Sequence, residues 1–193
     1  MSQTEPGAAA QEKGNDAGAL DPELVQKIAA VRSQVRESFG KIVMAMMMLP
    51  RYRHQTLGDL QHMLLEPLMR DRVAIAYPPE ADKTPLADLA GVAIWASVSD
   101  EVDAKIREQV KAGVFPVRLG AADWASGEIN WLLDVIAPNA KATASVISNF
   151  RQVVKGGDLR LHPVVAGMLD QETLHKMGMQ RSSSEKDNAE RGG

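Results

Sequence analysis

The chain has 193 residues, of which 45% are hydrophobic and 24% charged, the composition of an ordinary globular domain whose core needs no disulfide or metal. Its formal net charge of −3 argues against general nucleic-acid binding, which favours a basic surface. The sequence contains no cysteine, which excludes disulfides, thiolate metal sites and a cysteine-linked acyl intermediate.

Both ends of the chain are predicted to be disordered tails. Residues 1–20 are rich in Ala, Gly, Glu and Gln and offer almost nothing to bury, and residues 181–193 are polar. The start of the chain lacks the pattern of a signal peptide, and the most apolar run, 42–49, is far shorter than the ~20 residues of a membrane-spanning helix. We therefore expect one folded domain over residues 21–180, a cytoplasmic location and no membrane span.

The first part of the folded region is predicted to be helical. Pro22 at the first helical position starts an amphipathic helix, which is expected to break at Gly40. Residues 42–49 are apolar on all sides, which predicts a buried helix. The alternative is an adaptable surface for an acyl chain or a partner, because Met is soft and tolerates varied shapes. Pro50 ends this segment, and Thr56 opens the next helix with a capping box.

The second part of the folded region alternates strands with helices. Apolar and β-branched runs predict strands over 72–77, 89–98, 116–119, 129–137 and 159–164. Helices are expected after Ser99 and after Pro138, a loop over 78–83, and a weak helix over 169–177. Helices first, then strands interrupted by helices, predict an α+β fold with a largely antiparallel sheet.

One carboxylate, Asp134, falls inside the most apolar of these strands. Strict alternation divides the strand into one face with Ile129, Trp131, Leu133 and Val135 and another with Asn130, Leu132, Asp134 and Ile136. Both faces are mostly apolar, which indicates a central strand covered on both sides. Burying an unpaired ion costs several kcal/mol, so Asp134 is expected to have a partner or a changed pKa. A structural hydrogen bond and a catalytic role both remain open.

Four histidines are available for acid–base chemistry: His54, His62, His162 and His175. None of them has the pairwise spacing of a zinc motif. His54 lies in a basic connector, residues 51–55, just ahead of a helix, and His62 lies on that helix. These residue patterns alone predict an α+β domain with one unusual buried acid and no further function.

A set of residues at fixed spacing carries a family resemblance. The set is Trp124-x-Ser126-Gly127-Glu128-x-x-Trp131-x-x-Asp134-x-x-Ala137-Pro138, supported by the strand with Val92-Ala93 and Trp95-Ala96. In these residues, the chain from about Gly40 to Val164 resembles the RTX-toxin-activating lysine acyltransferases, the family that includes the alpha-haemolysin activators.

The resemblance implies a fold related to the GNAT acetyltransferases and a homodimer. It also implies a cytoplasmic reaction in which a fatty acyl chain passes from acyl-acyl carrier protein to internal lysines of an RTX-type protoxin. The donor is then the carrier-bound acyl group, and no bound cofactor is expected.

The resemblance also implies a catalytic pair, a histidine in a Ser-Pro-x-His segment and the aspartate of the Trp-x-x-Asp strand. The aspartate corresponds to Asp134. An ungapped match places Leu49 at the family serine and Tyr52 at the family histidine, and the nearest histidine is His54. A short shift in the connector makes His54 the expected base, oriented by Asp134, and an altered site is the alternative.

Basic residues flank the expected site. Arg51, Tyr52 and Arg53 are the expected substrate-binding residues, and Arg51, Arg53, Arg70 and Arg72 form an edge suited to an acidic carrier protein. The alternative is an ordinary solvated basic edge.

Two other functions are alternatives to lysine acylation. One is a non-catalytic relative that grips a lysine-containing partner, favoured by the substitutions at Leu49 and Tyr52. The other is a CoA-dependent N-acetyltransferase acting on a small amine.

Overall fold

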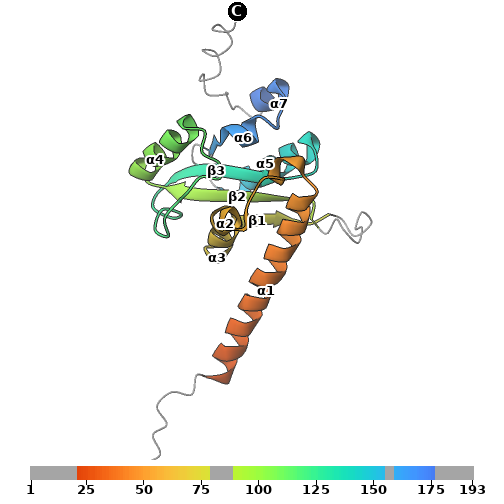
Figure 1. The fold of residues 1–193 in the computed structure, drawn as a ribbon, viewed down its shortest axis with the longest axis vertical. Coiled ribbons are helices and arrows are strands. Elements are labelled where there is room, and N and C mark those ends of the chain that lie inside the picture. Colours follow the sequence, from red (N-terminus) through yellow and green to blue (C-terminus); the bar gives the residue numbers. More distant parts are fainter. Residues whose placement is uncertain (1–20, 79–88, 155–158, 177–193) are drawn as a thin grey trace, which may run out of the picture. The chain divides into compact units, whose positions relative to one another are not determined.

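The computed structural model describes residues 21–78, 89–154 and 159–176 (Figure 1). The predicted tails, 1–20 and 181–193, and most of the predicted loop at 78–83 lie outside the described residues. By its contacts the chain divides into two units, Met1–Gln34 and Val35–Gly193.

The helices are α1 (Pro22–Met47), α2 (Leu57–Leu60), α3 (Glu66–Met69), α4 (Asp100–Lys111), α5 (Ala140–Val153), α6 (Pro163–Ala166) and α7 (Gln171–Lys176), with a 3₁₀ turn η1 (Pro50–Tyr52) and a π-helical turn η2 (Gln61–Leu65). The strands are β1 (Val73–Ala76), β2 (Gly91–Val98), β3 (Ile129–Ile136) and β4 (Leu159–Leu161).

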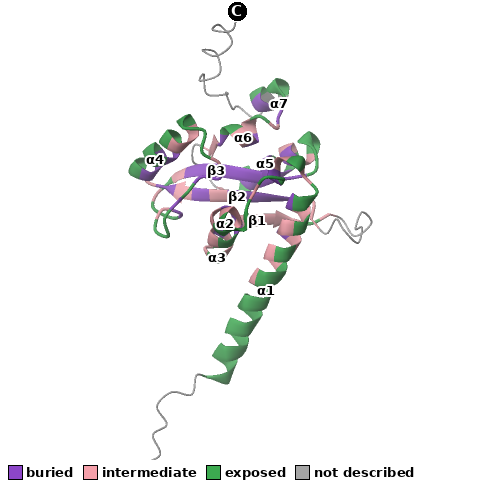
Figure 2. Cartoon of the chain, in the orientation of Figure 1, coloured by how far each residue is buried: buried purple, intermediate pink, exposed green. Residues whose placement is uncertain are grey.

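The sheet confirms the predicted α+β class and its mostly antiparallel pairing. Its order is β1-β2-β3-β4, with β1, β2 and β3 antiparallel and β4 parallel to β3 after the crossover helix α5. Figure 2 shows β2 and β3 as buried over most of their length. One core cluster contains residues of α1, η2 and α4 on one face of these strands, and a second cluster contains residues of α5, α6 and α7 on the other.

The prediction that the first helix breaks at Gly40 is wrong, because α1 runs on to Met47. A glycine inside a helix costs only about 1 kcal/mol relative to alanine, and the burial of Ile42 and Met46 just beyond it offsets that cost. The prediction of all-round burial over 42–49 is also wrong. Three methionines in or directly after the last turns of α1 are exposed: Met44, Met47 and Met48.

Residues 116–119 form no strand, contrary to the prediction. The N–H of Arg118 donates to the side chain of Gln109 at 2.8 Å, and the carbonyl of Arg118 accepts from the same side chain at 3.0 Å. The Gln109 side chain thus satisfies both backbone groups of Arg118, which would otherwise need a strand partner.

The last strand is shorter than predicted. β4 ends at Leu161, and α6 begins at Pro163, a residue that is common at the first position of a helix and rare in central strands. His162, expected in the strand, is instead the N-cap of α6. Its Nδ1 accepts a hydrogen bond from the N–H of Val164 at 3.2 Å.

A β-bulge interrupts β3 next to its aspartate. Ile94 of β2 lies opposite Asp134, and the next residue, Trp95, lies opposite Leu132. Leu133 is therefore an extra residue with no partner across the ladder. An insertion of this kind re-aims the side chains beyond it and is frequent next to active sites.

The bulge overturns the strict alternation predicted for β3. Leu133 packs in the cluster of α1 and α4, and so does Ile136, whereas Val135 packs in the opposite cluster. Asp134 lines the same cavity as Leu133, so the two neighbours face the same side of the sheet. The bulge thus turns Asp134 toward the segment after α1.

Candidate active site

Asp134 is buried, with 3% of its surface exposed, and its polar contacts among the described residues are with donors. The Tyr52 hydroxyl donates to Oδ2 at 2.8 Å, the backbone N–H of Val135 donates to Oδ1 at 2.8 Å, and Nη2 of Arg51 lies 3.1 Å from Oδ1. The expectation that this carboxylate has partners is confirmed. Three donors around one carboxylate favour its ionised form.

The connector after α1 supplies the two side-chain partners. Pro50 starts η1, which directs Arg51 and Tyr52 onto β3. At its far end the connector is fixed by the predicted capping box, in which Thr56 Oγ1 accepts from the N–H of Asp59 at 3.2 Å and Asp59 accepts from the N–H of Thr56 at 2.9 Å. The partners of Asp134 are thus held between a helix end and a capped helix start.

The two terminal nitrogens of the Arg51 guanidinium have partners inside the protein, whereas its buried Nε has none among the described residues. The guanidinium donates to the Tyr52 hydroxyl and to the carbonyl of Val135, and its Nη1 lies 2.7 Å from the sulfur of Met168. It also stacks over the Tyr52 ring, with Cζ 4.4 Å from the ring centroid. Arg51 therefore holds the site together from within, which leaves little of it to bind a substrate.

Burial dominates the electrostatics of this group. It raises the pKa of Asp134, and the positive charge of Arg51 together with the three donated hydrogen bonds opposes that effect only in part. Burial and the neighbouring negative charge of Asp134 also raise the pKa of Tyr52. The phenol therefore keeps its proton at physiological pH and acts as a hydrogen-bond donor.

His54 lies elsewhere on the connector. It is exposed in a turn beside Arg53, also exposed, and makes no hydrogen bond, ion pair or ring contact with the described residues. The structure thus brings together Asp134, Tyr52 and Arg51. The residue in contact with the aspartate is Tyr52, which the ungapped match aligned with the family histidine.

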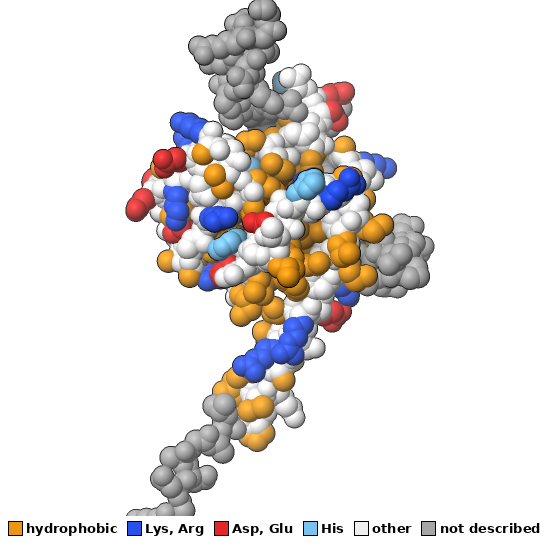
Figure 3. All heavy atoms as spheres, in the orientation of Figure 1, with side chains coloured by type: hydrophobic (Ala, Val, Ile, Leu, Met, Phe, Trp, Pro, Cys, Tyr) orange, Lys and Arg blue, Asp and Glu red, His pale blue; other side chains and the backbone are white. Residues whose placement is uncertain are grey.

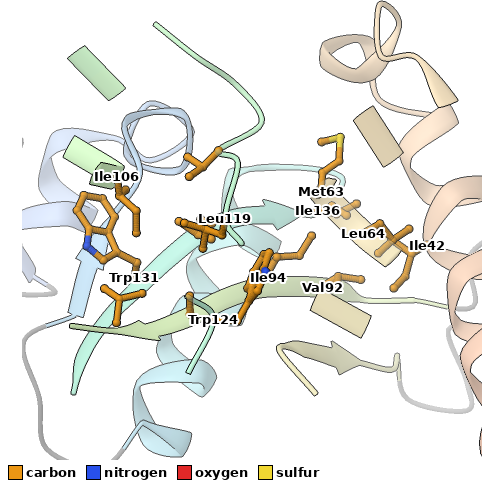
Figure 4. Close-up of a cluster of buried hydrophobic side chains, with 14 of the residues drawn as sticks. Ile42, Met63, Leu64, Val92, Ile94, Ile106, Leu119, Trp124, Trp131 and Ile136 are labelled. Atoms are coloured by element: carbon orange, nitrogen blue, oxygen red, sulfur yellow. The ribbon is translucent and has the colours of Figure 1, made fainter. Parts of the chain in front are cut away.

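A small cavity opens beside Asp134. Its volume is about 20 Å³, enough for one group the size of a water molecule. Figure 4 labels three of its apolar lining residues, Met63, Ile94 and Trp124, within the larger core cluster. Besides Asp134, the only titratable group among the described lining residues is His62.

Sequence reasoning placed His62 on a helix but gave it no role. The π-helical turn η2 places it in the cavity wall, because the wide turn, in which the N–H of Glu66 bonds the carbonyl of Gln61, rotates the residues within it. The one available signal was Pro67. Its missing N–H disturbs the preceding helical turn, and π-turns occur often at functional sites.

Two residues of the Trp-x-Ser-Gly motif have structural roles. Ser126 Oγ accepts a hydrogen bond from the N–H of Ser99 at 2.9 Å, which fixes the end of β2. A side chain at Gly127 would place Cβ 2.6 Å from the carbonyl oxygen of Val98, so only glycine fits there. The third residue, Trp124, is 2% exposed, and its indole N–H has no partner among the described residues.

A second buried aspartate, Asp103 on α4, was not singled out from the sequence. Its Oδ1 accepts from the indole N–H of Trp131 at 2.7 Å and from Arg160, and its Oδ2 lies 2.8 Å from Nη2 of Arg107. Burial alone would raise the pKa of Asp103, but the hydrogen bonds from Arg160 and Trp131 and the charges of both arginines lower it.

The other arginines of the expected docking edge also have internal partners. Arg70 forms an ion pair with Glu66 and donates to the carbonyl of Ala121 at 3.1 Å. Arg72 donates to the carbonyl of Trp124 at 3.2 Å and lies over the Trp95 ring. Among the four arginines, Arg53 is the one with no such contact to the part of the chain that the structure describes.

Hydrophobic side chains gather on the face formed by α2, α3 and the end of α1 (Figure 3). We call this group the methionine-rich patch, and its exposed members are Met44, Met47, Met48, Leu57, Leu65 and Met69. Exposed apolar side chains that gather on one face of a protein often mark an interaction site.

The described residues contain no cluster of three or more acidic or histidine side chains placed to hold a metal ion. No helix within 21–78, 89–154 or 159–176 combines the length and apolarity needed to cross a bilayer.

The sequence matches the model of one protein family, described as the RTX toxin acyltransferase family, over residues 31–173. The match includes the connector, the bulged strand and every residue in contact with Asp134. No curated protein matches the chain.

Proposed function

Because the chain belongs to the RTX toxin acyltransferase family, a family of toxin-activating acyltransferases, we propose that it acylates internal lysines of an RTX-type protoxin. The fatty acyl group comes from acyl-acyl carrier protein, without a bound cofactor. The single observation that carries this proposal is Asp134, a buried carboxylate turned by a bulge toward a cavity that also holds a histidine.

The chemistry requires a proton acceptor near a fixed negative charge. A lysine amine has an ordinary pKa near ~10.4, so only about one in 10³ is neutral at pH 7. Its nitrogen attacks the thioester carbonyl and must then lose a proton, a step to which a positioned base contributes ~10²–10⁴-fold. Asp134 supplies the charge that stabilises a protonated base, and Tyr52 and Arg51 hold its carboxylate in place.

The catalytic pair expected from the sequence, His54 and Asp134, stays a prediction. The exposed turn that carries His54 has no contact with Asp134 among the described residues, so this pairing requires the connector to rearrange when a substrate binds.

The remaining features of the family are also proposed for this chain. A relation to the GNAT acetyltransferases is supported by the mostly antiparallel sheet with its parallel last strand. A homodimer and a cytoplasmic reaction follow from the family resemblance alone. The methionine-rich patch supports a surface for the acyl chain or the protoxin, and Arg53 is the arginine best placed to attract an acidic carrier.

Intact-mass analysis tests the function. The chain is coexpressed with the RTX-type protoxin encoded nearest its gene, and the protoxin is weighed. We expect a mass gain of one or more long acyl chains, abolished by Asp134→Asn. A gain of one acetyl group would instead identify a CoA-dependent acetyltransferase.

The rival binding function has its own support. Tyr52 donates a hydrogen bond to the aspartate and Arg51 forms an ion pair with it, so these contacts resemble those of a structural carboxylate. No mass gain, together with stable copurification of the protoxin, would favour this non-catalytic reading.

A further inference from the structure

The hydroxyl of Tyr52 is committed to holding Asp134. It donates to Oδ2 at 2.8 Å and accepts from Arg51, and its ring is 6% exposed between the guanidinium and the sheet. A phenol held in this way keeps its proton, so Tyr52 positions the carboxylate and the base must be another side chain.

His62 is the histidine that shares a space with Asp134. Both line the cavity of about 20 Å³, Asp134 from the bulge of β3 and His62 from the π-turn of η2. His62 is half-buried, so it can reach both the cavity and the solvent. A proton acceptor in this position can release its proton to water after each turnover.

The size and lining of the cavity suit an amine head group. One water-sized space is also the space that a lysine nitrogen needs, and its wall includes the apolar side chains of Met63, Ile94 and Phe115. The Trp124 indole N–H, buried in the same wall without a partner, is a donor available to an oxygen that becomes negative.

We propose that His62 is the proton acceptor of acyl transfer, acting on an amine that enters the cavity beside Asp134. This assignment rests on the proposed function. The amine nitrogen forms a bond to the thioester carbonyl carbon, and the carbon–sulfur bond breaks. The proton on nitrogen passes to the His62 imidazole, and the sulfur leaves as the carrier thiolate, which takes a proton to become the free thiol.

Single-turnover acylation tests the assignment, with myristoyl-acyl carrier protein as donor and the RTX-type protoxin as acceptor. We expect His62→Gln to lower the rate about 10²–10⁴-fold, the usual contribution of a positioned base. His175→Gln, a matched change at an exposed residue of α7, is expected to keep the wild-type rate. If His54→Gln loses the rate and His62→Gln keeps it, the assignment is overturned.

Chemical rescue separates chemistry from folding. Free imidazole is expected to restore part of the rate of His62→Ala, because it can enter the space that the side chain leaves. A structural role for His62 predicts no rescue. Thermal unfolding of His62→Gln checks that the variant is folded. If it is not, rescue of His62→Ala under conditions where that variant is folded decides the question.

A second measurement is independent of activity. In long-range ¹H–¹⁵N spectra of the imidazoles, Asp134→Asn is expected to shift the ring signals of His62 and to leave those of His175 in place. Unchanged His62 signals would overturn the shared cavity. Shifted signals in a protein that acylates nothing would keep the cavity pair and overturn the proposed function together with the role of His62 as its base.

Discussion

The two buried aspartates, Asp103 and Asp134, are almost equally hidden from solvent and differ in how they are neutralised. Asp103 has two arginines and an indole N–H, and its pKa is lowered. Asp134 has one arginine, a phenol and a backbone N–H, and its pKa is raised. Burial alone therefore does not separate the two acids. The amount of positive charge beside each carboxylate does.

The surroundings of the two acids differ in the same sense. Asp103 joins three elements, since its partners lie on α4, β3 and β4. Asp134 lies at a bulge and lines a cavity with a histidine. Asp103 therefore links elements of the fold, whereas Asp134 borders a cavity that it shares with His62.

The largest expected effect on stability comes from a third buried group, His162. Its contribution to the pH dependence of stability has to be measured separately from that of the two aspartates. Burial lowers the pKa of His162 to about 4. The unfolded chain, with an ordinary histidine pKa of about 6.5, binds the proton more readily, so stability is lost as pH falls from about 6.5 to 4, by about 3 kcal/mol in total. His162→Asn should abolish that part of the slope in urea unfolding. An unchanged slope would contradict this.

The next effect compares the two acids directly. Asp103→Asn leaves two arginines without their anion, and because both are partly exposed we expect a loss of about 2 kcal/mol rather than the larger penalty of a fully buried pair. Asp134→Asn should change the free energy of unfolding by about 1 kcal/mol or less, since it also removes the cost of burying a charge. Urea unfolding at pH 7 measures both values. Equal losses of unfolding free energy in the two variants would contradict the proposed difference between Asp103 and Asp134.

The pH dependence of the two variants should have opposite signs. The folded pKa of Asp103 lies below its unfolded value, so its contribution to stability is present at neutral pH and lost below about pH 4. The folded pKa of Asp134 lies above its unfolded value, so its contribution is largest in acid and falls as pH rises above about pH 4. Subtracting each Asn variant from the wild type in a His162→Asn background isolates the two curves. Curves with the same sign would refute this reading.

A similarly small effect is expected at Tyr52. Tyr52→Phe removes the hydrogen bond to Asp134 and the acceptor for Arg51 but keeps the ring, which should cost about 1 kcal/mol of stability. Tyr77→Phe, at an exposed tyrosine, is the matched control and should cost nothing measurable. A loss several times larger at Tyr52 would mean that the Asp134 group is itself a structural centre.

The sequence predicts much of the fold because local patterns decide it. The β3 strand, the helix after Ser99 and the Thr56 capping box follow from apolar runs and cap residues and are confirmed. The requirement that Asp134 have partners follows from the cost of burying charge, and it is confirmed too.

The site geometry depends on departures from periodicity. The extra residue at Leu133 turns Asp134 to the other face, and nothing in an apolar run marks where a bulge will fall. The position of His62 depends on a π-turn, and the pairing of Tyr52 with Asp134 joins residues 82 positions apart. Local sequence patterns do not predict long-range contacts of this kind.

The most direct test is the single-turnover acylation rate of Asp134→Asn against that of Asp103→Asn, each measured at a temperature where the variant is folded. We expect Asp134→Asn to lose about 10²-fold or more and Asp103→Asn to stay within a few-fold of the wild type. A wild-type rate in Asp134→Asn would show that the buried carboxylate on β3 serves the fold alone and would contradict the account.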